Sequence, residues 1–121
     1  MKSANGRYTT TQRVLVIDND SIMGAGVETL LANSEKLQVI GTAPQNEDDI
    51  VHDVWQFSPD VIILNYQSQL TTPVRLLSLL NNYRSFRLIV VSEDDNMMEV
   101  YEKRQFTARH HSDLATAVQW N

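Results

Sequence analysis

Short apolar blocks, separated by segments of helical period, constrain the fold of this chain more than any other feature. The blocks are rich in β-branched residues and lie at 14–17, 39–40, 61–64 and 88–91. Strands that are apolar along their whole length are buried on both faces, as in a parallel sheet covered by helices. The blocks therefore predict the strands of such a sheet.

The segments between these blocks carry apolar residues at the spacing of one helical face. Three such sets follow the first three blocks: Met23, Val27, Leu30 and Leu31; Ile50, Val54 and Phe57; and Leu76, Leu77, Leu80 and Tyr83. Each set predicts an amphipathic helix. Asn46 is expected to cap the second helix, and Pro59 to end it. The alternation of strand and helix predicts βαβ units with right-handed crossovers in a doubly wound α/β sheet.

The last third of the chain shows the same pattern in a compressed form. Residues 95–104 are expected to make two or three helical turns, and residues 105–109 a short fifth strand. A final helix beginning at Ser112 is expected to present three apolar side chains to the core: Leu114, Ala117 and Val118. The expectation is therefore five parallel strands and five helices.

Composition limits the classes of function. The chain has 121 residues, 42% of them hydrophobic and 21% charged, which is typical of one folded domain. We expect a flexible leader over residues 1–12 and a single domain over residues 13–121. Ten Lys and Arg residues against fifteen Asp and Glu residues give a net charge of −5, which disfavours nucleic acid and anionic lipid as partners.

Several other classes are excluded by what the sequence lacks. It has no cysteine, which rules out disulfides, thiolate catalysis and cysteine-ligated zinc. Its apolar runs are too short to span a membrane, and the polar N-terminal segment is unlike a secretory signal. We therefore expect a cytoplasmic protein.

Polar residues follow the predicted strands at the point where each strand ends. They are Asp18, Asn19 and Asp20 after the first strand, Asn65 after the third, Ser92 after the fourth and Arg109 after the fifth. Ligands of open α/β sheets bind beyond the carboxyl ends of the strands, so we expect these residues to converge. The alternative, from spacing alone, is that Asp18, Asp20 and Ser92 are turn and cap residues.

Three segments together resemble a known family. They are VLVIDNDSIMGAGVETLLA from Val14, SPDVIILNY from Ser58 and RLIVVSE from Arg87. In this order and at this spacing they resemble the receiver domain of bacterial two-component response regulators, over about residues 13–93. The resemblance implies a flavodoxin-like sheet with strand order 2-1-3-4-5. It also implies a phosphorelay pocket with two adjacent acidic residues for magnesium, a phosphoacceptor aspartate, a switch hydroxyl and a lysine.

The positions of that pocket are altered here. Asp18 matches the first acidic residue, but Asn19 stands at the second acidic position and Asn65 at the phosphoacceptor position. An amide oxygen is not a nucleophile toward phosphorus at neutral pH, and a single carboxylate holds Mg²⁺ weakly at most. We expect no catalytic residue, and no cofactor beyond weak Mg²⁺ binding at Asp18. The expected degenerate pocket consists of Asp18, Asn19, Asp20, Asn65, Ser92 and, at the lysine position, Arg109.

The resulting hypothesis is a pseudo-receiver, which is not an enzyme and signals through protein–protein contact without accepting phosphate. Because the sequence ends soon after the last predicted helix, we expect the response to pass through a protein partner, a homodimer or a longer protein. The resemblance places the partner surface on the last elements of the fold. Its expected residues are Met97, Met98, Tyr101, Leu114, Val118 and Trp120.

Three alternatives stay open. One is a phosphorylatable receiver in which Asp18 or Asp20 accepts the phosphate. The second is a sensor of a small molecule or nucleotide in the same crevice, and the third is a purely structural dimerisation unit. A metal site at His110 and His111 is disfavoured, because adjacent residues rarely face one metal.

Overall fold

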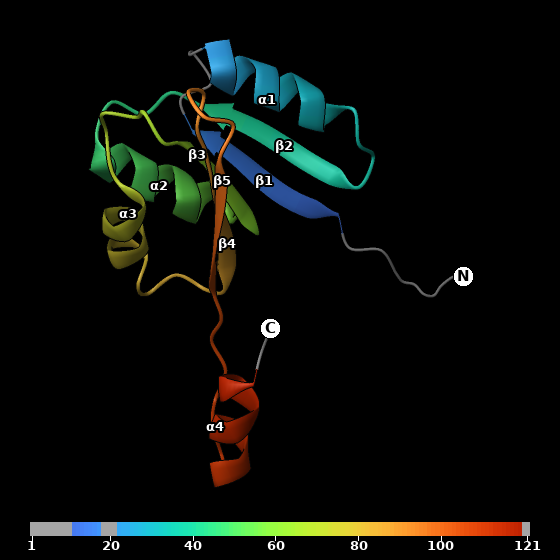
Figure 1. The fold of residues 1–121 in the computed structure, drawn as a ribbon, viewed down its shortest axis with the longest axis vertical. Coiled ribbons are helices and arrows are strands. Elements are labelled where there is room, and N and C mark those ends of the chain that lie inside the picture. The colour runs from blue at the N-terminus through green and yellow to red at the C-terminus, as the bar shows by residue number, and fades with distance from the viewer. Residues whose placement is uncertain (1–10, 18–21, 120–121) are drawn as a thin grey trace.

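The computed structural model describes residues 11–17 and 22–119. Its elements are β1 (Gln12–Ile17), α1 (Ile22–Ala32), β2 (Leu37–Thr42), α2 (Glu47–Phe57), β3 (Val61–Asn65), α3 (Pro73–Leu79), β4 (Phe86–Val91), β5 (Met98–Lys103) and α4 (His111–Val118). The strands form one sheet in the order β2-β1-β3-β4-β5 (Figure 1). This confirms the α/β class and the strand order 2-1-3-4-5, which is a flavodoxin-like layout.

The centre of the sheet is buried on both faces, as the apolar blocks predict. Alternate side chains of β1 and β3 point to opposite sides of the sheet. Leu15, Ile17, Ile62 and Leu64 pack with α2 and α3 on one side. Val14, Val16, Val61 and Ile63 pack on the other side, where Val27 and Leu31 of α1 lie. The side that carries α1 is called the α1 face below.

The ends of α2 are fixed by identifiable groups. The Asn46 side chain caps the first turn by accepting a hydrogen bond from the backbone nitrogen of Asp49 at 2.8 Å, which confirms the predicted cap. At the other end Ser58 adopts a left-handed conformation with φ 56°. The chain then reaches β3 through Pro59, whose carbonyl accepts a hydrogen bond from the buried Tyr83 hydroxyl at 2.7 Å. These contacts set where β3 begins.

The fifth strand differs from the expectation. The predicted helical turns over 95–104 and the parallel strand over 105–109 are wrong, because residues 98–103 form β5 and run antiparallel to β4. Only residues 92–97 separate the two strands, whereas a parallel pair requires a crossover of a dozen or more residues. The connection is a hairpin, and Asn96 turns it with φ 56°. The sheet is therefore mixed.

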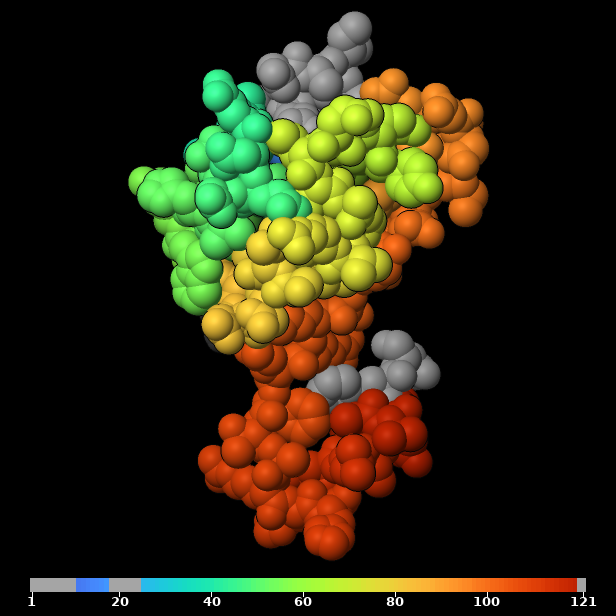
Figure 2. All heavy atoms as spheres, turned by 90° about the vertical axis from the view of Figure 1, so that its left-hand side faces the viewer, coloured from blue at the N-terminus to red at the C-terminus, as the bar shows by residue number. Residues whose placement is uncertain are grey.

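The last helix does not pack on the core. The described part of the chain contains four helices rather than five, and α4 forms a separate lobe beyond the sheet (Figures 1 and 2). Leu114 and Val118, expected in the core, are 68% and 77% exposed. Because β5 is antiparallel, it carries the chain to the edge where β4 begins. Residues 104–110 then lead away from the sheet and carry α4 with them.

Most of the expected leader lies outside the described residues, but its last residue, Gln12, is the first residue of β1. No helix within residues 11–17 and 22–119 is both long and apolar enough to cross a membrane.

Candidate functional site

The carboxyl ends of β3 and β4 lie side by side and bring two predicted site residues to the same edge. Asn65, the last residue of β3, pairs with Val91, the last residue of β4. The backbone nitrogen of Tyr66 then donates a hydrogen bond to the carbonyl of Val91 at 2.8 Å. Ser92 follows directly. The sheet therefore places Asn65 and Ser92 at one edge, as the sequence predicts.

Gln67 links the two loops that leave this edge. Its backbone nitrogen donates a hydrogen bond to Asn65 Oδ1 at 2.9 Å, which turns the chain back over the end of β3. Its side-chain Nε2 then donates to Ser92 Oγ and to Asp94 Oδ2, each at 3.2 Å. A longer contact of 3.5 Å joins its Oε1 to the backbone nitrogen of Glu93. The loop after β3 is thereby tied to the loop after β4.

The loop after β4 makes this edge acidic. Glu93, Asp94 and Asp95 lie in the hairpin turn between β4 and β5, where the helical turns expected over 95–104 would begin. Asn65 Nδ2 donates to Glu93 Oε1 at 3.5 Å, and Asp95 Oδ1 accepts from the backbone nitrogen of Met97 at 3.1 Å. The carboxylates thus accept hydrogen bonds from neighbouring amides. In the described segments, no three Asp, Glu or His side chains come together as ligands for a metal ion.

The predicted acidic residues of the first strand, Asp18, Asn19 and Asp20, lie outside the described residues. β1 itself is described as far as Ile17 and lies beside β3, where Val16 pairs with Ile63.

Arg109 is not brought to this edge. β5 ends opposite the first residue of β4, at Lys103, and Arg109 lies in the segment between β5 and α4. The backbone nitrogen of Arg109 donates to Asp113 Oδ2 at 2.8 Å, at the start of α4. Its assignment to the lysine position depended on a parallel fifth strand, which the structure replaces with an antiparallel one.

The lysine that β5 does contain has another role. Lys103 Nζ donates to the carbonyl oxygens of Leu80, Asn81 and Tyr83 at 2.8, 2.7 and 2.6 Å. These carbonyls follow α3 at the opposite edge of the sheet from Asn65. Lys103 therefore ties β5 to the end of α3, where a cation is favoured by the helix dipole.

A small cavity lies beside the Gln67 contacts, on the side of the sheet opposite the α1 face. Its volume is about 170 Å³, and its lining residues are Tyr66, Val90, Ser92, Asp95, Met97 and Glu99. Pockets that hold small organic ligands usually measure about 300–1,000 Å³. The volume therefore suits one inserted side chain of a partner better than a nucleotide.

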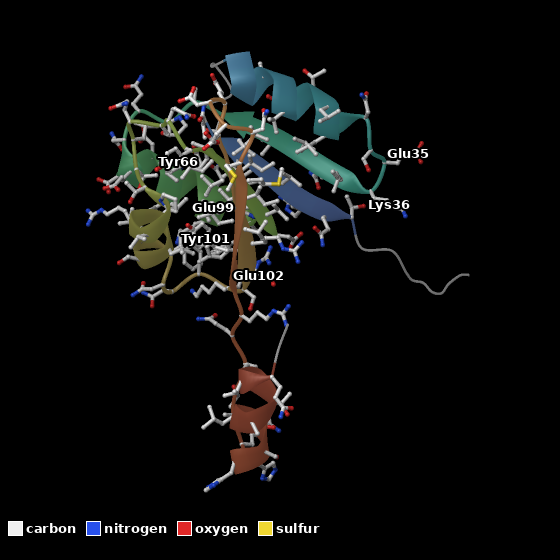
Figure 3. All side chains as sticks on the ribbon, in the orientation of Figure 1. Glu35, Lys36, Tyr66, Glu99, Tyr101 and Glu102 are labelled. Carbon is white, nitrogen blue, oxygen red and sulfur yellow. The ribbon has the colours of Figure 1, made fainter. Side chains whose placement is uncertain are left out.

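Glu99 of β5 lines this cavity, and Tyr101 lies two residues farther along the same face of the strand. Figure 3 shows both below Tyr66. The Tyr101 hydroxyl donates a hydrogen bond to Glu99 Oε1 at 3.0 Å. This bond, and the negative charge of Glu99, raise the pKa of Tyr101 above its ordinary value. Tyr101 thus keeps its proton and stays a hydrogen-bond donor.

The predicted partner surface is divided among three places. Met97 and Tyr101 lie beside the cavity, since Tyr101 pairs with Leu88 and shares its face of the sheet. Met98 pairs with Val91 and lies on the α1 face. Leu114 and Val118 are exposed on α4, and Trp120 lies outside the described residues.

Gln67 is the site residue that sequence reasoning missed. Its only signal is its place two residues after Asn65, where an amide side chain is able to reach across to the neighbouring strand. The contact itself depends on β3 and β4 being adjacent and in register, which is a tertiary property.

Comparison of the chain with protein-family models, with curated proteins and with solved structures finds no match.

Proposed function

We propose that this domain is a pseudo-receiver, which resembles response-regulator receivers and signals by protein–protein contact without accepting phosphate. The observation that carries the proposal is Asn65. It ends the central strand of the sheet at the carboxyl edge, beside Ser92, where the receiver resemblance calls for an acceptor carboxylate. Its Oδ1 is an amide oxygen and accepts a hydrogen bond from the backbone of Gln67. Such an oxygen does not form an acyl phosphate.

The contacts of Gln67 support a signalling state that does not depend on phosphate. In the family that the chain resembles, a hydroxyl at the end of the fourth strand moves onto the phosphate. Here Ser92 Oγ already accepts a hydrogen bond from Gln67 Nε2, and the same nitrogen donates to Asp94. The loop after β4 is held by the protein itself, so the domain presents one surface constitutively.

The surface beside the cavity is the contact area that the proposal assigns to the partner. Tyr66 and Met97 are exposed there, and Tyr and Met are enriched in the centres of protein interfaces. Two carboxylates, Asp95 and Glu99, line the same cavity, and Glu93 and Asp94 lie in the loop that carries Asp95. A complementary partner presents an apolar side chain to the cavity and basic side chains around it.

The test of the proposal is incubation with acetyl phosphate and Mg²⁺, followed by intact mass measurement. We expect no gain of a phosphoryl group on the natural chain, because Asn65 offers no carboxylate. The matched variant is Asn65→Asp, which restores one carboxylate of nearly the same shape. A phosphoryl gain on the natural chain, lost in Asp18→Asn or Asp20→Asn, would show a working receiver and overturn the proposal.

A further inference from the structure

Part of the α1 face is bare. α1 contacts β1 and β2, at one side of the sheet, and in the described residues no helix covers β4 and β5 on this face (Figure 1). Two apolar cross-strand pairs point to it, Ile89 with Val100 and Val91 with Met98, and the ion pair of Arg87 with Glu102 follows them on the same face. Val100 is 55% exposed and Met98 62% exposed. The face thus leaves an apolar strip over two neighbouring strands open to solvent.

The same chain contains a helix with an unused apolar face. Leu114 and Val118 are four residues apart on α4 and therefore lie on one side of the helix, with Ala117 beside them. No residue of α4 is buried, and α4 makes no extensive contact with another described element. A helix about 10 Å across spans two strands that are about 4.8 Å apart, so the width of α4 matches the bare strip.

The segment that connects β5 to α4, residues 104–110, favours packing of α4 on a second molecule over packing on its own sheet. To cover the sheet of its own chain, α4 must reverse direction relative to β5 within residues 104–110. This segment contains no Gly, Pro, Asn or Asp, the residues that favour turns. Phe106 and Thr107 favour an extended chain instead. In the structure the segment leads α4 beyond the end of the sheet (Figure 1).

We propose that two copies of the chain exchange α4, so that each α4 covers β4 and β5 on the α1 face of the other copy. Leu114 and Val118 would then contact Met98 and Val100 of the second copy. Such an exchange is symmetric and closes as a dimer, because each copy both gives and receives a helix. The proposal goes beyond the proposed function and does not depend on it, since the Asn65 edge takes no part in the exchange.

Disulfide trapping tests the exchange directly, because the natural chain has no cysteine. The variant Val100→Cys/Leu114→Cys changes two exposed residues, so it is expected to fold. After mild oxidation we expect a covalent dimer on a non-reducing gel, with no free thiol. The matched control is Val100→Cys/Thr116→Cys, in which the exposed Thr116 lies on the opposite side of α4. It is expected to give little dimer.

Each other result overturns the exchange. A disulfide within one chain would show that α4 covers the sheet of its own copy. Free thiols in both variants would show that α4 does not cover this strip. An equal yield of dimer from both variants would show that α4 meets the second copy without a preferred side of the helix facing the strip.

The oligomeric state of the full chain gives a second readout. Light scattering during size-exclusion chromatography is expected to show a dimer for the natural chain and for Thr116→Lys, and a monomer for Leu114→Lys. A monomeric natural chain would contradict the proposal. A dimer that persists in Leu114→Lys would place the contact elsewhere, for example at the open edge of β5, and would contradict it as well.

Discussion

Gln67 shows how one side chain determines the state of the carboxyl edge. Its amide reaches from the loop after β3 to Ser92 and Asp94 in the loop after β4. Asn65 fixes the backbone of Gln67 from the other side. These hydrogen bonds are exposed, so each contributes little to the free energy of unfolding, but together they define where the loop after β4 lies.

Gln67→Ala is expected to loosen that loop without unfolding the domain. The stability loss should be about 1 kcal/mol or less, because the lost bonds are replaced by bonds to water. Hydrogen exchange at the backbone amides of Ser92 and Glu93 should become faster, whereas β1 should be unaffected. The matched control is Gln69→Ala in the same loop, which should leave exchange at Ser92 unchanged. Unchanged exchange in Gln67→Ala would contradict the linking role.

Tyr83 is the residue whose ionisation opposes folding most clearly. Its hydroxyl is buried and donates to the carbonyl of Pro59, and burial raises its pKa above 10.0. In the unfolded chain the hydroxyl ionises at its ordinary pKa. Its contribution to stability is therefore complete below pH 10.0 and is lost as the pH rises through the higher pKa of the folded state.

Tyr83→Phe is expected to lower the free energy of unfolding by about 1–3 kcal/mol at neutral pH, because the buried Pro59 carbonyl loses its donor. The same variant should lose less stability than the natural chain when the pH is raised above 10.0. Urea unfolding at both pH values measures the two effects. Tyr66→Phe, at an exposed position, is the control. Equal alkaline loss in the natural chain and in Tyr83→Phe would contradict this account.

At the scale of elements, the strands that can be predicted are those whose own residues specify a strand, without contacts from the rest of the sheet. β3 is apolar from Val61 to Leu64, and burial on both faces follows from that. β5 is different, because its sequence MEVYEK alternates while Met97, Val100 and Tyr101 also fit one face of a helix. The strand is favoured over the helix because β4 offers unpaired backbone groups along its outer side and because the connection between β4 and β5 is a short hairpin. Both are properties of the assembled sheet, so sequence pattern alone gave the wrong element.

The two ends of α2 allow two substitutions with opposite expected effects on stability. Ser58 holds a left-handed conformation that favours glycine, so Ser58→Gly is expected to raise the free energy of unfolding by about 0.5 kcal/mol. Asn46→Ala removes the side-chain cap and should lower it by about 1 kcal/mol. Thermal or urea unfolding of both variants checks the two signs. A loss of stability in Ser58→Gly would show that the contacts of the Ser58 side chain stabilise the fold by more than its left-handed backbone conformation costs.

At the scale of the whole molecule, the direction of β5 explains which site residues the sequence could predict. Asn65 and Ser92 follow parallel neighbours, so they meet at one edge as expected. Arg109 does not join them, because an antiparallel β5 takes the chain to the far edge. The same reversal leaves α4 away from the core. One change of strand direction thus separates the predicted cation, and Leu114 and Val118 of the predicted partner surface, from the rest of the site.

The central claim is that the carboxyl edge has no working phosphate pocket, and NMR titration of backbone amides with Mg²⁺ and then beryllofluoride tests it most directly. Beryllofluoride mimics a phosphoryl group on an acceptor carboxylate. We predict no chemical-shift change at Asn65 and Ser92 in the natural chain, and clear changes at both positions in Asn65→Asp. Saturable shifts of Asn65 and Ser92 in the natural chain at low millimolar Mg²⁺ would contradict the account and would favour the phosphorylatable receiver instead.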